Sequence, residues 1–98
     1  MLVKIHKSYR IVVAICDSEL LGKRFEQGNL QLDLTTEFFK GDKMTEKQVL
    51  EIIQDLLRED ASFNIVGEKA IKIALKSGII SKEGIRRIQN VPVALTLL

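Results

Sequence analysis

A Lys-Arg pair set between two glycines is the first place in this 98-residue chain where the residue types suggest chemistry. Lys23 and Arg24 lie between Gly22 and Gly28, shortly after an apolar run that ends in Cys16. Glycine lets the backbone approach an anion closely, but the stretch lacks the Gly-x-x-x-x-Gly-Lys-Ser/Thr pattern of a nucleotide-binding loop. We predict that both glycines are turn residues and that the basic pair contacts phosphate. The alternative is a loop that itself holds the anion.

A cysteine and a histidine are the other candidate pair, since imidazole can activate a thiol as a nucleophile. Cys16 lies in an apolar run, where a free cysteine usually packs as a small hydrophobe, and His6 is the single histidine. Their meeting would require adjacent strands. Asp17 is expected to cap the turn at residues 18–20. No acid and base can be paired, so we assign no catalytic residue, and no metal spacing or cofactor motif is present.

Basic residues gather in the last third of the chain. Residues 61–98 hold six basic and two acidic side chains, whereas residues 45–60 hold two basic and five acidic ones. Besides Lys82, the six are three lysines at helical spacing and an arginine pair: Lys69, Lys72, Lys76, Arg86 and Arg87. A solvated helix face is the ordinary account of such a stripe. The hypothesis that we carry forward is that these residues, with Lys23 and Arg24, contact RNA phosphates rather than bases.

Alternating apolar residues predict the strands. They lie at residues 2–6, 10–17 and 30–35, with a last strand at 91–98. The first two are expected to form a hairpin, and the second is apolar on both faces, which is typical of a central strand. Pro92 has no backbone N–H, so it is predicted to confine the start of the last strand to a sheet edge.

Two helices complete the predicted elements. Residues 45–60 begin with a capping box of Thr45 and Gln48 and continue with apolar residues at helical spacing. Residues 63–78 predict a second helix that ends at a glycine. The spacing of Asn64 and Glu68 places them on one face of this helix, and a structural cap is the simpler account of the pair. The small residues of this helix, expected to pack against the sheet, are Gly67, Ala70 and Ala74.

The bulk composition indicates one folded domain over residues 1–98. Hydrophobic residues make up 46% and charged residues 29%, which is ordinary for a globular protein. We predict an α+β fold with a mixed sheet of about four to five strands and two main helices. The single cysteine cannot form an internal disulfide, so a reducing cytoplasm is the expected location. No apolar run approaches the roughly 18 residues of a membrane span, and the oligomeric state stays open.

Several segments together resemble a small archaeal family called domain of unknown function 424. They are "VKIHKS", "VVAICDSELLGKRFEQGNLQLDL", "FNIVGEKAIKIALKSGII" and "NVPVAL", spanning about residues 3–94. The matching positions are His6, Lys7, Cys16, Asp17, Leu21, Gly22, Lys23, Phe25, Gly28, Asn64, Ile65, Val66, Gly67, Glu68 and Pro92. The family is uncharacterised, and the resemblance implies RNA binding or a link to translation. Relatives typically carry Pro-His-Ala-Gln near the end, whereas this chain has Pro92-Val93-Ala94-Leu95 and lacks that histidine and glutamine.

Three functions follow as hypotheses. The first is a non-catalytic, cytoplasmic RNA-associated protein that contacts ribosomal or transfer RNA. The second is a protein-interaction module whose outer face is the acidic helix at residues 45–60. The third is a small enzyme of unknown reaction, which ranks last because no pair of catalytic groups can be assigned.

Overall fold

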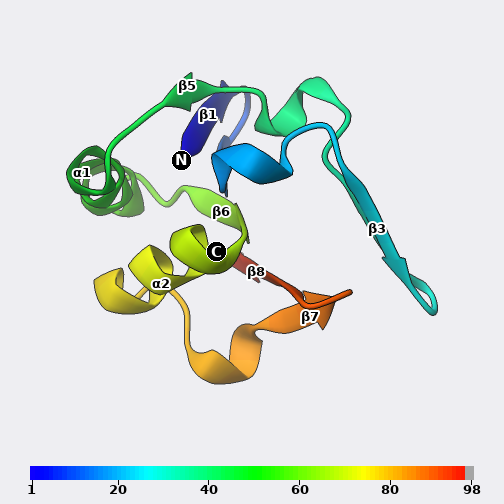
Figure 1. Ribbon diagram of the computed structural model, residues 1–98. Coiled ribbons are helices and arrows are strands. Elements are labelled where there is room, and N and C mark those ends of the chain that lie inside the picture. Colours follow the sequence, from blue (N-terminus) through cyan, green and yellow to red (C-terminus); the bar gives the residue numbers. More distant parts are fainter. Residues whose placement is uncertain (97–98) are drawn as a thin grey trace.

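A six-stranded mixed sheet runs through the computed structural model, which describes residues 1–96 (Figure 1). Its strands, in the order β5-β1-β2-β6-β8-β7, are β1 (Leu2–Lys7), β2 (Ile11–Cys16), β5 (Asp42–Lys43), β6 (Ser62–Val66), β7 (Arg86–Ile88) and β8 (Val91–Thr96). A separate two-stranded ribbon consists of β3 (Arg24–Gln27) and β4 (Leu30–Asp33). The helices are α1 (Glu46–Leu57), α2 (Glu68–Ser77) and the short 3-10 helices η1 (Ser18–Leu20), η2 (Glu37–Phe39) and η3 (Lys82–Gly84). The predicted α+β class is confirmed.

The centre of the sheet is a parallel pair of strands. β1 and β2 form the predicted antiparallel hairpin, while β2 and β6 run parallel and Cys16 is paired with Val66. Parallel strands end at the same edge of a sheet, so the residues that follow β2 and β6 become neighbours. This edge therefore brings together Asp17 and Gly67, which are far apart in the sequence.

Helix α1 begins where the sequence predicts it, because its start signals are local, but it ends at Leu57 and residues 58–60 of the predicted helix lie beyond it. The Thr45 hydroxyl accepts a hydrogen bond from the Gln48 amide at 3.2 Å, and the Gln48 side chain accepts one from the Thr45 amide at 2.9 Å. This capping box satisfies two backbone donors that would otherwise lack a partner. Val49 and Ile53 are buried on the face toward the sheet.

The prediction of a helix over residues 63–78 is wrong at its start. Residues 62–66 form strand β6, and α2 begins only after Gly67, whose φ of 108° is not helical. Phe63 and Ile65 are buried while Ser62 and Asn64 between them are half-buried, which is the alternation of a strand, and ladders with β2 and β8 satisfy its backbone. Asn64 therefore lies in a strand and shares no helical face with Glu68. The predicted end is confirmed, since Gly78 follows α2 with a φ of 83°.

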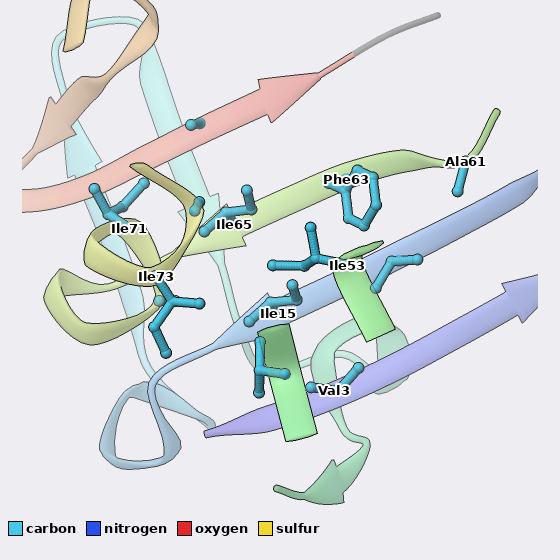
Figure 2. Packing of buried hydrophobic residues seen from close by; sticks show 13 residues of the cluster. Val3, Ile15, Ile53, Ala61, Phe63, Ile65, Ile71 and Ile73 are labelled. Atoms are coloured by element: carbon cyan, nitrogen blue, oxygen red, sulfur yellow. The ribbon is translucent and has the colours of Figure 1, made fainter. Parts of the chain in front are cut away.

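The two faces of the sheet are covered differently. Helices α1 and α2 pack on one face over a core of side chains from β1, β2, β6 and β8, and Figure 2 shows this cluster. Ala70 and Ala74 are buried in it, so the predicted packing of the small residues against the sheet is confirmed. The β3–β4 ribbon and η2 cover the other face, with Leu32 and Phe39 packed near Cys16.

The last strand is an interior strand of the sheet. β8 pairs with β6 on one side and β7 on the other, so the prediction that Pro92 confines its start to an edge is wrong. Pro92 lies beyond the last residue paired with β6, and its carbonyl accepts a hydrogen bond from the Gly67 amide at 2.9 Å. Residues 97 and 98 of the predicted strand lie outside the described residues. Within residues 1–96, no helix is long and apolar enough to cross a membrane.

Candidate nucleic-acid interface

The side chain of Asp17 closes the N-terminal end of helix α2. Its two carboxylate oxygens accept hydrogen bonds from the amides of Ala70 at 2.8 Å and Lys69 at 3.0 Å, and Asp17 is only 3% exposed. The expectation that Asp17 caps the turn at residues 18–20 is wrong, because its side chain makes no capping bond there. The reason is topological: β2 and β6 end side by side, so Asp17 meets a helix that begins 51 residues later, at Glu68.

Gly67 makes room for this carboxylate. A Cβ at Gly67 would lie 2.4 Å from Cγ of Asp17, and the φ of +108° already excludes most other residues. The amide of Asp17 donates to the Val66 carbonyl at 3.1 Å, which continues the ladder past the strand ends. We call Asp17, Gly67 and the first turn of α2 the capped junction. Its contacts explain Asp17 and Gly67 by folding alone.

The structure does not bring Cys16 and His6 together. Cys16 is paired with Leu2 and His6 with Val12, so along the strands they are four residues apart, or about 13 Å. His6 Nε2 lies 2.9 Å from the Phe38 carbonyl oxygen, and the two rings stack with centroids 4.6 Å apart. Burial is the main cause that raises the pKa of the Cys16 thiol to about 11, so the thiol stays protonated.

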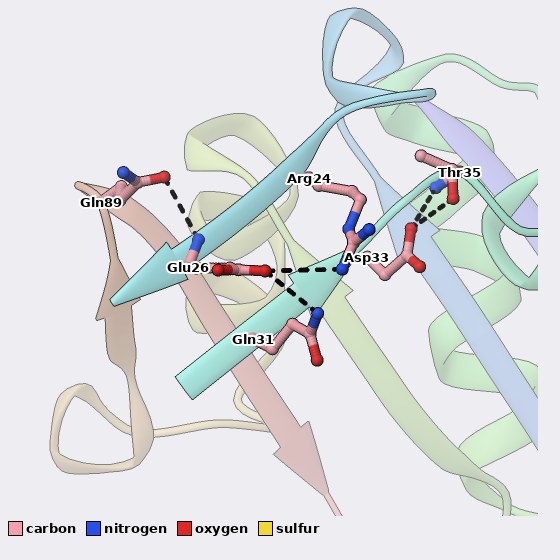
Figure 3. A network of polar contacts seen from close by, with 6 residues as sticks. All are labelled: Arg24, Glu26, Gln31, Asp33, Thr35 and Gln89. Atoms are coloured by element: carbon pink, nitrogen blue, oxygen red, sulfur yellow. Dashed lines mark hydrogen bonds and ion pairs between the residues drawn. The ribbon is translucent and has the colours of Figure 1, made fainter. Parts of the chain in front are cut away.

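The loop with the first basic pair is a turn, as predicted. Gly22 and Gly28 have φ angles of 87° and 60°, and the Gly22 amide donates to the Leu34 carbonyl at 2.8 Å. Arg24 lies at the start of β3, where its guanidinium is 3.5 Å from the Glu26 carboxylate (Figure 3). Its neighbour Lys23 is exposed. The glycines therefore shape the ribbon, and the arginine already has an anionic neighbour.

Polar contacts hold the ribbon against the rest of the molecule (Figure 3). The Glu26 amide donates to the Gln89 side chain at 3.3 Å, which joins the ribbon to the turn between β7 and β8. Just after β4, the hydroxyl and the amide of Thr35 donate to the Asp33 carboxylate within the same segment and lower the pKa of that carboxyl. The ribbon is thus attached by a hydrogen bond to the turn between β7 and β8.

A groove opens between α2 and the segment of residues 82–87. We call it the basic groove; its volume is about 480 Å³ and its lining residues are Glu68, Lys69, Ile71, Lys72, Leu75, Lys82, Ile85 and Arg87. Lys69 and Lys72 come from α2, whereas Lys82 and Arg87 come from the opposite wall. Four basic groups against one carboxylate make the groove strongly cationic, and charge in a concave site is focused.

The cations of the basic groove differ in their state of pairing. Arg87 donates to the Glu68 carboxylate at 2.7 Å and to the Asn90 carbonyl at 3.0 Å. Lys69, Lys72 and Lys82 have no carboxylate within ion-pair distance anywhere in residues 1–96. The exposed ammonium groups are therefore available to an anion from outside.

The seven residues predicted to contact phosphate do not form one surface. The groove gathers Lys69, Lys72 and Arg87, and Lys76 lies on the next turn of α2 outside its lining. Arg86 is paired with Val93, which packs on the ribbon side of the sheet, so Arg86 and Arg87 point to opposite faces. Lys23 and Arg24 lie on the ribbon.

Sequence reasoning missed two contributors to the groove. Lys82 stands alone in the sequence, and Ile85 looks like an ordinary apolar residue in "GIRRI". Both face α2 because the chain turns back after Gly78 and runs along the helix through η3. The only local signal was the glycine that ends α2.

A family model described as a protein of unknown function (DUF424) matches residues 6–97. A solved structure with a similar fold is the crystal structure of an uncharacterized conserved protein from Methanopyrus kandleri. The two share 24% sequence identity with a TM-score of 0.86, and the match covers 97% of this chain and 88% of that chain. No curated protein matches. The resemblance seen in the sequence is confirmed, and the structural likeness shows the fold alone.

Proposed function

Because this chain belongs to the DUF424 family, whose activity is unknown, we propose from its own surface that it is a non-catalytic RNA-associated protein. RNA phosphates are held in the basic groove by Lys69, Lys72 and Lys82. The observation that supports this proposal is the concentration of three unpaired lysines on both walls of one groove. Phosphate contacts of this kind supply affinity that depends little on sequence and falls as salt rises.

The proposal extends to the ligand class and the location. Ribosomal and transfer RNA are abundant polyanions and are the candidate ligands, with the cytoplasm as the place of action. The free, buried thiol of Cys16 is compatible with a reducing compartment. A nucleophilic enzyme finds no support in the site, since the thiol is buried and distant from His6 in the strand register.

The test removes one lysine from each wall. Lys72→Gln combined with Lys82→Gln should weaken binding of unrelated RNA sequences by similar factors. The slope of log affinity against log salt should fall by about 0.7 to 0.9 for each lost phosphate contact, or about 1.5 for the pair. Both side chains are exposed, so the melting temperature should barely change. Titrations at several salt concentrations measure the slope.

A matched control carries the same change of charge elsewhere. Lys43→Gln combined with Lys47→Gln alters β5 and α1, and β5 lies at the sheet edge opposite β7. This variant should bind RNA with nearly the wild-type slope. If both double variants have the wild-type slope, the lysines of the groove are a solvated face and the proposal is wrong.

A second candidate function rests on a different surface. A cavity of about 820 Å³ at the end of acidic helix α1 is lined by Tyr9, Arg10, Ile11, Glu59 and Asp60. Tyr9 is 99% exposed. Leu57, the last residue of α1 and two positions before Glu59, is 43% exposed. Exposed aromatic and aliphatic side chains beside carboxylates favour a protein partner. Protein capture that survives nuclease and is lost in Tyr9→Ala would favour this function over RNA binding.

A further inference from the structure

Between its lysines, the basic groove has an apolar lining. The residues responsible are Ile71, Leu75 and Ile85, which come from both α2 and the opposite wall. Ile71 is only 4% exposed and belongs to the core under α2, so the half-buried Leu75 and Ile85 present most of the apolar surface, while the lysines are exposed at the rim. A surface that binds phosphate alone has no need of such a lining.

We infer that the basic groove takes single-stranded RNA, with base faces against its aliphatic lining and phosphates at the lysines of its rim. This inference rests on the proposed function and narrows it. A duplex presents phosphates and sugars while its bases stay stacked inside, so it leaves the exposed apolar surface of Leu75 and Ile85 uncovered. A single strand presents both an apolar base face and a charged backbone, which matches the two kinds of lining.

The groove is expected to be tolerant of sequence. Apart from the lysines, its polar side chains are Glu68 and Arg87, and these two already bind one another at 2.7 Å. Few groups are therefore left to read the donor and acceptor pattern of a base edge. Contact with the face of a base is tolerant of sequence, because every base has such a face.

The first experiment needs no variant of the protein. Affinity at one salt concentration is measured for a short oligouridylate, for the same strand paired with oligoadenylate, and for an abasic strand of the same length. The oligouridylate should bind about ten-fold more tightly than the abasic strand, which corresponds to roughly 60 Å² of buried apolar surface. The duplex should also bind less tightly than the single strand.

A variant then tests whether the bases contact Ile85 in the basic groove. Ile85→Thr keeps the branched shape in an extended segment and should bring oligouridylate affinity close to that of the abasic strand, with an unchanged salt slope. Ile5→Thr is the matched control, since Ile5 is also half-buried and extended but lies in β1 away from the groove. The control should bind as the wild type does.

The outcomes separate the inference from the proposed function. Equal affinity for all three nucleic acids overturns the inference, while RNA binding through the lysines stands. If none of them binds and polyglutamate does, the groove takes an acidic protein segment, and both the inference and the proposed function are wrong.

Discussion

Helix α2 presents two regions of opposite kinds, the capped junction at its N-terminal end and the basic groove along its flank. At the junction, a carboxylate that is part of the protein fills the place where a helix commonly binds an anion. In the groove, exposed lysines have no carboxylate within ion-pair distance in residues 1–96. At its N-terminal end, α2 is therefore capped by a carboxylate of the same chain, whereas the lysines along its flank have no carboxylate partner in the described residues.

This contrast distinguishes residues that stand out because the fold needs them from residues that are placed to meet a ligand. Asp17, Gly67 and Pro92 are among the positions that carry the family resemblance, and all three meet at or beside the junction. Their contacts account for them as parts of the fold. Lys72 and Lys82 are not among those positions, yet they are the groups that an external anion would meet. The resemblance identifies the fold, and the groove must be assigned on its own geometry.

The largest expected effect tests the junction. Gly67→Ala should lower the free energy of unfolding by about 2 to 6 kcal/mol, because a Cβ would strain the backbone and collide with a buried side chain. Chemical denaturation measures this loss. Gly84→Ala is the control: a Cβ there would meet no atom within 4 Å, so stability should change by less than about 0.5 kcal/mol. Similar losses in the two variants would mean that the junction is not tightly packed.

The next effect in size concerns the cap itself. Asp17→Ala should lower the free energy of unfolding by about 2 to 3 kcal/mol, since the Lys69 and Ala70 amides lose their acceptors. Asp17→Asn keeps one acceptor oxygen and should cost less. RNA affinity of the folded protein should stay unchanged in both. An Asp17→Asn protein that keeps its stability but loses RNA would make the junction a ligand site and end the contrast.

Sequence reasoning succeeded where the signals are local. The capping box and the apolar spacing of α1 lie within one helix, and the turns at Gly22 and Gly28 need only a backbone preference. It failed at β6, because residues 63–66 run directly into the apolar pattern of α2, and a segment of five residues is too short for its alternation to outweigh that pattern. The segment forms a strand because β2 and β8 pair with it on either side.

The candidate site was predicted only in part for the same reason. Lys69 and Lys72 share a helix face by their spacing, so they were found together. The separation of Arg86 from Arg87 follows from strand pairing, and Lys82 joins the groove only through the return of the chain along α2. The cap of α2 by Asp17 depends on two strands that end at one edge. None of these relations can be read from one continuous segment of the sequence, because each depends on how distant segments pair.

The smallest expected effect concerns the ion pair at the boundary between the two regions. Glu68 begins α2 and binds Arg87 at 2.7 Å, with side chains 67% and 54% exposed. Glu68→Gln should lower the free energy of unfolding by less than about 1 kcal/mol, because exposed ion pairs contribute little. It should also strengthen RNA binding and steepen the salt slope by up to about 1, since the freed guanidinium gains a phosphate contact.

Glu51→Gln on α1 provides the comparison for this last effect, because it removes the same charge from an exposed position that does not line the groove. Any general gain from the higher net charge appears in both variants, so only the excess in Glu68→Gln reports on Arg87. An equal gain in both would mean that Arg87 belongs to the structural region alone. The RNA-contacting part of the groove would then consist of its lysines, and the boundary between the two regions would lie between Arg87 and Lys72.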